Sequence, residues 1–174
     1  SRNYVRPKIL SADGDVADFT VDYEPWPVDT VRTVREMRRF TLPAGTNFTR
    51  LTSTLASDSA GELVVGIGIS KRPTNGGALG EVRKDGAAAR LTWWGPAEGA
   101  KGRMAAAVIV DPASFAGFAE DADNYLILVR VQPGKPFVYY SGAAWDGGGD
   151  FVTKGAWQAY VDAQRPEFKP PSEP

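Results

Sequence analysis

Alternation of apolar and polar residues runs through much of the chain and predicts β-strands. Residues 18–23 read Asp-Phe-Thr-Val-Asp-Tyr, which places Phe19, Val21 and Tyr23 on one face of a strand. Similar runs lie between turns rich in glycine and proline, at residues 30–42, 46–55, 63–70, 89–94, 103–110, 124–131 and 136–141. Residues 153–163 instead have helical spacing, with Thr153 as the N-cap. These elements predict an all-β fold, an antiparallel β-sandwich with one short C-terminal helix.

The length of 174 residues fits one domain. We expect a single β-sandwich domain over residues 1–164 and a proline-rich, extended tail over residues 165–174. The run at residues 63–70 is almost wholly apolar, which predicts a central strand buried on both faces. Trp93 and Trp94 are adjacent, so a strand points them to opposite faces, and we expect one of them to leave the core.

Two absences in the composition remove much chemistry. The chain has no histidine and no cysteine, which excludes Ser-His-Asp triads, histidine-ligated metals, thiolate sites and disulfides. Carboxylate, Lys, Arg and Tyr chemistry remains. The net charge of −1 provides no field that would attract nucleic acid. No apolar run approaches the roughly 20 residues of a membrane span, so we expect neither a nucleic-acid nor a membrane partner.

Residues 137–151 run from an apolar strand into an aromatic, glycine-rich loop with two carboxylates, Asp146 and Asp150. Tyr139 and Trp145 offer flat apolar faces with a polar edge, and carboxylates accept hydrogen bonds from hydroxyl groups. This mixture suits a sugar ligand. The alternative is that Trp145 plugs the open end of a sandwich while the glycines only turn the chain. A calcium ion held by the two carboxylates stays open as well; otherwise we expect no cofactor and no metal.

A strand over residues 30–42 places Glu36 and Arg38 on its more apolar face. A carboxylate at such a position needs a partner or an open cavity, because an isolated buried charge is costly. Glu36 is therefore either paired with an arginine or a functional acid.

Two further groups of residues are candidates for sugar contacts. Lys71 and Arg72 follow the apolar run and could bind a sugar carboxylate, although a solvated pair is the alternative. Trp94 and Trp26 could stack on pyranose faces, although the pattern around Trp26 favours a side chain that fills the edge of the sandwich.

Five segments are distinctive in their order along the chain. They are residues 34–36 (Val-Arg-Glu), 42–48 (Leu-Pro-Ala-Gly-Thr-Asn-Phe), 65–72 (Val-Gly-Ile-Gly-Ile-Ser-Lys-Arg), 137–145 (Phe-Val-Tyr-Tyr-Ser-Gly-Ala-Ala-Trp) and 149–151 (Gly-Asp-Phe), followed by Trp157. Together they resemble the C-terminal half of the bacterial domain-of-unknown-function family 4861. The resemblance implies a galactose-mutarotase-like supersandwich, a periplasmic or secreted location and an association with polysaccharides that contain uronate. It also implies that an N-terminal half is missing from this chain.

Three functions follow from these observations and stay open. The first is a carbohydrate-active domain that binds or cleaves uronate-containing glycans, as a polysaccharide lyase or glycoside hydrolase if it is an enzyme. The fold-level analogy assigns catalysis to Tyr140, Asp150 and Glu36, and substrate binding to Trp145, Tyr139, Asp146, Lys71, Arg72 and Trp94. The second is a sugar-binding module without catalysis. The third is a structural half-domain whose open sheet edge is completed by a homo-oligomer or by the missing N-terminal half.

Overall fold

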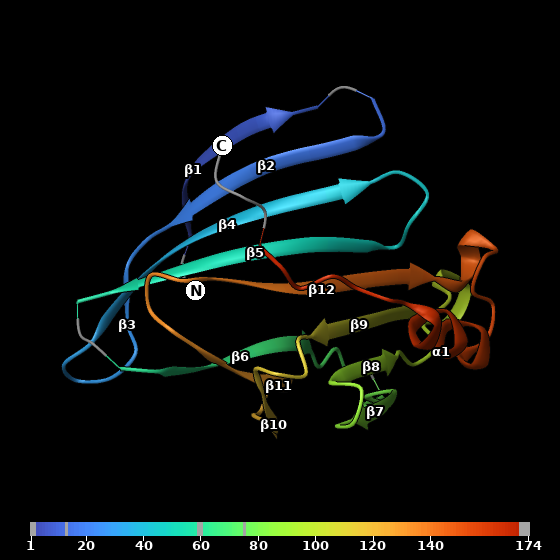
Figure 1. Cartoon of the computed structure of the whole chain (residues 1–174). Helices are drawn as coiled ribbons and strands as arrows, with labels where there is room; N and C mark the ends of the chain where they lie inside the picture. The colour runs from blue at the N-terminus through green and yellow to red at the C-terminus, as the bar shows by residue number, and fades with distance from the viewer. Residues whose placement is uncertain (1–2, 13, 59–60, 75, 171–174) are drawn as a thin grey trace.

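The protein is seen in a computed structural model that describes residues 3–12, 14–58, 61–74 and 76–170. Over these residues it is an antiparallel β-sandwich with one short helix (Figure 1). The strands are β1 (Tyr4–Ser11), β2 (Val16–Tyr23), β3 (Trp26–Pro27), β4 (Thr33–Pro43), β5 (Phe48–Ser57), β6 (Leu63–Ser70), β7 (Glu81–Asp85), β8 (Arg90–Trp94), β9 (Met104–Val110), β10 (Phe115–Glu120), β11 (Asn124–Val131) and β12 (Pro136–Trp145). The helix α1 spans Lys154–Ala163, and two short 3-10 turns, η1 and η2, span Gly99–Lys101 and Asp146–Gly148.

The two sheets differ greatly in width. The large sheet has the order β1-β2-β4-β5-β12-β9-β8-β7, with β3 paired to β4, and the small sheet has the order β10-β11-β6. The small sheet packs over β8 and β9. The large sheet therefore continues well past the β6 edge of the small sheet, through β12, β5, β4, β2 and β1 (Figure 1).

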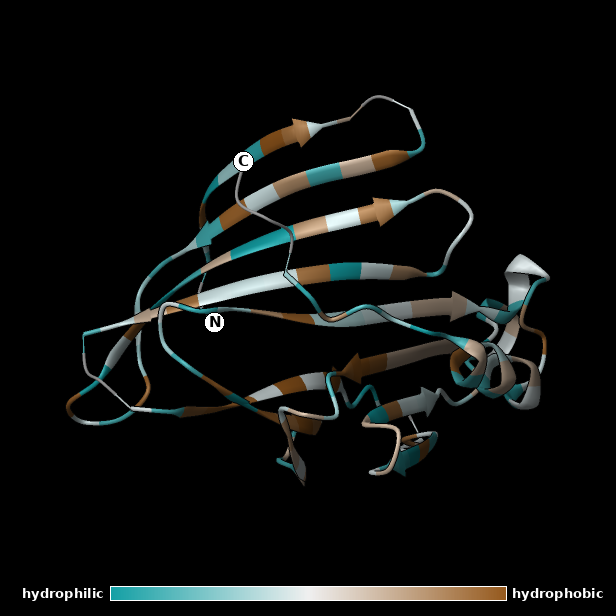
Figure 2. Ribbon diagram, viewed as in Figure 1, coloured by the Kyte–Doolittle hydropathy of each residue, from teal (hydrophilic) through white to brown (hydrophobic). Residues whose placement is uncertain are grey.

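The large sheet is buried on both faces around β8 and β9. One face packs on the small sheet through a core that includes Leu91, Trp93 and Val108. The other face packs on α1 through a second core that includes Trp94 and Trp157. Figure 2 shows the alternation of hydrophobic and hydrophilic residues along β2 and β4, where the sheet is less covered. Both adjacent tryptophans are 6 % exposed, so the expectation that one leaves the core is wrong: each sheet face has its own cover.

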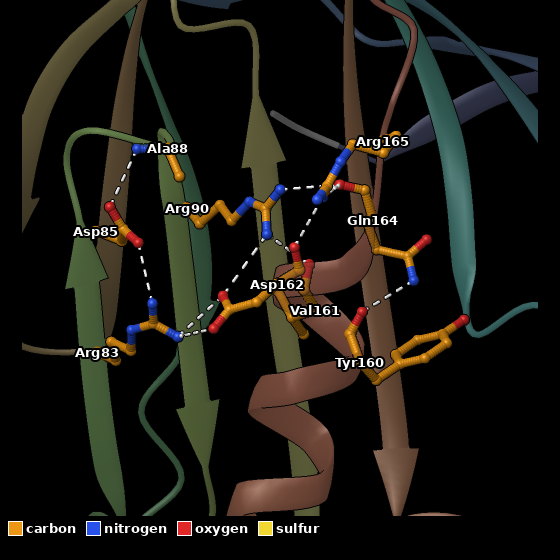
Figure 3. A network of polar contacts seen from close by, with 9 residues as sticks. All are labelled: Arg83, Asp85, Ala88, Arg90, Tyr160, Val161, Asp162, Gln164 and Arg165. Carbon is orange, nitrogen blue, oxygen red and sulfur yellow. Dashed lines mark hydrogen bonds and ion pairs between the residues drawn. The ribbon is translucent and has the colours of Figure 1, made fainter.

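Helix α1 is fixed at both ends by polar contacts. At its start, the Thr153 side chain accepts a hydrogen bond from Ala156 N, which caps the helix as expected. At its end, Arg90 of β8 donates to the carbonyl oxygens of Val161 (2.6 Å) and Gln164 (2.9 Å) (Figure 3). Arg83 of β7 adds an ion pair to Asp162. Carbonyls at a helix C-terminus lack partners within the helix, so Arg90 supplies donors to two of them, and both arginines tie α1 to the large sheet.

The sequence-based strand predictions are confirmed for β2, β4, β5, β6, β8, β9, β11 and β12, with ends that differ by a few residues. The strands β1, β7 and β10 are not predicted by the pattern of the sequence. The expectation that residues 63–70 form a central strand is wrong, because β6 is the edge of the small sheet. In the predicted tail, residues 165–170 run back over β12 and β5, where Lys169 O accepts from Arg50 (2.6 Å); residues 171–174 lie outside the described residues.

Candidate functional site

A cleft of about 620 Å³ opens between the free edge of β6 and the part of the large sheet that the small sheet leaves uncovered. Its floor is formed by β4, β5 and β12, and its wall by residues 64–68 of β6. The polar lining residues include Glu36, Arg38, Ser53 and Tyr139. The volume falls in the range of about 300–1,000 Å³ that is typical of small-molecule sites.

An ion pair lies on the floor of the cleft. Glu36 is 6 % exposed, and its Oε1 accepts from Arg38 Nε (2.9 Å), Arg38 Nη2 (2.7 Å) and Ser53 Oγ (2.9 Å). The hydrogen bonds to Glu36 within the described residues all end on Oε1. The second oxygen, Oε2, thus keeps its capacity to accept, and Arg38 Nη1 keeps its capacity to donate.

Aromatic rings surround the guanidinium of Arg38. It lies 5.1 Å from the ring centroid of Tyr23, 5.9 Å from that of Phe40 and 6.0 Å from that of Tyr139. Such distances allow cation–π attraction. Burial raises the pKa of Tyr139 to about 12, although the nearby charge of Arg38 acts in the opposite direction. The phenol is therefore protonated at neutral pH and can donate a hydrogen bond.

The period of two residues in β-strands explains why these groups meet. Glu36 and Arg38 are two residues apart on β4, so they share a face. Arg38 pairs with Ser53 of β5, and Ser53 pairs in turn with Phe137 of β12. Cross-strand partners point to the same face of a sheet, so Ser53 and Phe137 face the cleft on the same side as Glu36 and Arg38. Of the two alternatives for Glu36, pairing with an arginine is found, and the pair also faces an open cleft.

Tyr140 and Tyr139 lie on opposite faces of β12. The Tyr140 hydroxyl donates to Glu167 O (2.9 Å), and its ring packs edge-on against Phe168. This side of the sheet holds a separate cavity of about 720 Å³ beneath residues 164–170. Tyr140 is thus separated from Glu36 by the thickness of the sheet, and the structure does not bring these two candidate catalytic residues together.

The aromatic loop after β12 is also apart from the cleft. Trp145 is 49 % exposed, and its Nε1 donates to Lys101 O (2.7 Å). Asp146 Oδ1 accepts from the backbone N of Arg103 (2.8 Å), while Asp150 is exposed. Trp145 and Asp146 thus hold neighbouring backbone in place, and a partly exposed indole face remains.

The remaining candidate binding residues lie elsewhere. Lys71 Nζ donates to Asp121 O (2.7 Å) and pairs with Glu120 at 3.2 Å, which fixes it at the end of the small sheet. Arg72 is exposed beside it. Trp94 is buried beneath α1 and offers no ring face to solvent. Trp26 does line the cleft, where it packs against the core.

A family model described as a domain of unknown function, DUF4861, matches residues 1–173. The chain belongs to the DUF4861 family. No curated protein matches it. The resemblance seen in the sequence is therefore confirmed at the level of the family, whose description assigns no activity.

Of the residues that line the cleft in this DUF4861 chain, Glu36, Tyr139 and Trp26 were candidates from the sequence, whereas Arg38 and Ser53 were not. Tyr23, whose ring lies beside Arg38, was not a candidate either. The available signal was the shared strand face of Glu36 and Arg38. Among the described residues, no group of three or more Asp or Glu side chains is placed to hold a metal ion. Within the same residues, no helix has the length and apolarity needed to cross a membrane.

Proposed function

We propose that this DUF4861 domain binds a carbohydrate that carries carboxylate groups, such as an oligosaccharide of uronic acids, in the cleft over Glu36 and Arg38. The observation that carries the proposal is a polar pair with free hydrogen-bonding capacity on a floor lined by aromatic rings. Arg38 Nη1 suits a sugar carboxylate, and Glu36 Oε2 suits a sugar hydroxyl. Trp26 and Phe137, which also line the cleft, suit the apolar face of a pyranose ring.

The cleft supports binding better than catalysis. Glu36 is the one carboxylate among the lining residues, whereas most glycoside hydrolases use two carboxyl groups that flank the scissile bond. A lyase needs a base that removes a proton; a tyrosine is protonated at neutral pH, and burial raises the pKa of Tyr139 to about 12, further from that range. We therefore favour the binding module over the lyase or hydrolase.

Two finer expectations belong to the same proposal. The small sheet leaves uncovered the strands of the large sheet that line the cleft. This arrangement supports a relation to the galactose-mutarotase-like supersandwich, where sugars lie across an open sheet. A polysaccharide ligand also fits a periplasmic or secreted location, which the family resemblance implies.

Calorimetric titration with a trimer of galacturonic acid, and with a neutral galactose trimer as control, tests the proposal. Arg38→Met removes the cation of the cleft, and Arg39→Met is a matched control because Arg39 lies on the opposite face, paired with Asp18. We expect saturable binding of the acidic trimer that weakens at least tenfold in Arg38→Met and stays within about twofold in Arg39→Met.

Other results of these titrations would contradict or replace the proposal. Equal losses in both arginine variants, or no saturable binding by the wild-type chain, would contradict the proposal. The appearance of ultraviolet absorbance from an unsaturated uronate product, or of shorter sugars, would replace the binding module with a lyase or a hydrolase.

A further inference from the structure

A second cavity continues the cleft along the large sheet. It has a volume of about 300 Å³, and residues of β4, β5 and β12 form its floor, as they do in the cleft. Phe40, Leu51 and Ser141 line both cavities, so the two are neighbouring parts of one groove. The groove leads from Trp26 in the cleft to Asn47 in the second cavity.

The strand register gives the distance between the two parts of the groove. Ser53 of the cleft pairs with Arg38, and Thr49 of the second cavity pairs with Ser141. Ser53 and Thr49 lie four residues apart on β5 and share a face. At the rise of an antiparallel strand, their rows are about 14 Å apart. One sugar ring is shorter than this distance, so a ligand that contacts both rows is an oligosaccharide.

The two parts of the groove differ in charge. The cleft has the pair Glu36 and Arg38 on its floor, whereas every described residue that lines the second cavity is uncharged, so we call it the neutral cavity. Among the described residues, the hydroxyls of Thr49 and Ser141 have no hydrogen-bond partner. They can donate to sugar hydroxyls and accept from them. A carboxylate in the neutral cavity would lose part of its hydration without gaining a cation.

Contacts within the protein hold the neutral cavity in shape. Asn47 Nδ2 donates to Ala143 O (3.1 Å), and Ala143 N donates to Asn47 O (3.2 Å). The ring of Phe40 stacks on that of Phe19, with centroids 4.9 Å apart. A preformed cavity loses little conformational freedom when a ligand binds, so these contacts favour binding.

Building on the sugar-binding function proposed above, we infer that the ligand is a polysaccharide segment in which an acidic sugar is followed by uncharged sugars. The carboxylate of the acidic sugar lies against Arg38. The uncharged sugars run along β4, β5 and β12 into the neutral cavity, where an apolar ring face lies on Phe40 and hydroxyls meet Thr49 and Ser141. A polymer of uronic acid alone would place a carboxylate there.

Galacturonic acid tetramers provide probes that differ only in charge. One tetramer carries four free carboxylates. The other two carry a single free carboxylate, at the reducing or the non-reducing end, and have the remaining carboxylates as methyl esters. Calorimetric titration of the whole chain with each tetramer measures the preference, and the two singly charged tetramers allow for either direction of the sugar chain along the strands.

We expect one singly charged tetramer to bind at least about fivefold more tightly than the fully charged one, because its uncharged rings fit the neutral cavity. Thr49→Lys supplies a cation in that cavity and should remove or reverse this preference. Thr20→Lys adds the same charge on the opposite face, where Thr20 pairs with Arg39, and should leave the preference unchanged. The comparison of the tetramers uses the wild-type chain and does not depend on the folding of a variant.

Equal binding of the tetramers, or tighter binding of the fully charged one, overturns the inference and leaves the sugar-binding function intact. A preference that Thr49→Lys and Thr20→Lys change equally also overturns it, since the uncharged rings would then lie outside the neutral cavity. Failure of every tetramer and of the galacturonic acid trimer to bind overturns both the inference and the proposed function.

Discussion

The ion pair in the cleft can be tested by removing its members singly and together. Glu36→Leu leaves the Arg38 guanidinium without its counter-ion, and Arg38→Met leaves the Glu36 carboxylate with Ser53 as its hydrogen-bond donor. The double variant replaces both charges by apolar side chains of similar size. Buried pairs of this kind often contribute little net stability, although breaking one by removing a single partner is costly.

The burial of each partner sets the expected magnitudes. The Glu36 side chain is 5 % exposed, so Arg38→Met should lower the free energy of unfolding by about 3–5 kcal/mol. The Arg38 side chain is 22 % exposed and can recruit water, so Glu36→Leu should cost less, about 2–4 kcal/mol. The double variant should lie within about 1 kcal/mol of the wild type, which implies a coupling free energy of at least about 4 kcal/mol.

Urea unfolding followed by tryptophan fluorescence at neutral pH measures the four free energies. The sugar titration of the same double variant should show no binding although the protein is fully folded. A double variant whose loss equals the sum of the single losses would refute the reasoning, because the pair would then contribute separately through each side chain.

Three further predictions concern the scaffold. Arg90→Met should lower the free energy of unfolding by about 2–4 kcal/mol, because two carbonyls at the end of α1 lose a charged donor. The control Arg165→Met, at an exposed residue, should lower it by under about 1 kcal/mol. Equal losses of the two variants in urea unfolding would contradict this prediction. Because the pKa of Tyr139 is raised in the folded protein, the free energy of unfolding should fall by about 2–3 kcal/mol as the pH rises from 10 to 12. Tyr139→Phe should remove this pH dependence of the free energy of unfolding. An unchanged pH dependence in the variant would show that another group causes it. Gly142→Ala should cost about 1–3 kcal/mol in thermal unfolding because its Cβ would meet Asn47 O at 2.9 Å, whereas Gly148→Ala, in open space, should be nearly neutral.

Local pattern was sufficient to predict most of the strands. The alternation in β2 and β4 and the capped pattern of α1 are local signals, and each predicted the right element. β1 and β7 were not predicted because Pro7 and the charged run Glu81–Asp85, which protect sheet edges, weaken the apolar alternation. In β6 the opposite happened: an apolar sequence predicted a buried strand where the described chain has an open edge.

The candidate site was predicted only where one strand face carried it. Glu36 could be recognised because a carboxylate on an apolar face needs a partner. Ser53 and Tyr23 join it through cross-strand register, which depends on how distant segments pair and is not readable from either strand alone. The aromatic loop drew attention by composition, yet the hydrogen bonds of Trp145 and Asp146 hold nearby backbone.

The most direct test of the account is amide NMR of the chain during titration with the galacturonic acid trimer. Sugar in the cleft should shift the resonances of Glu36, Arg38, Ser53 and Tyr139 with one common dissociation constant, and leave those of Tyr140, Asp146 and Asp150 unchanged. Shifts confined to the loop around Trp145, or no shifts at all, would contradict the placement of the binding site in the cleft.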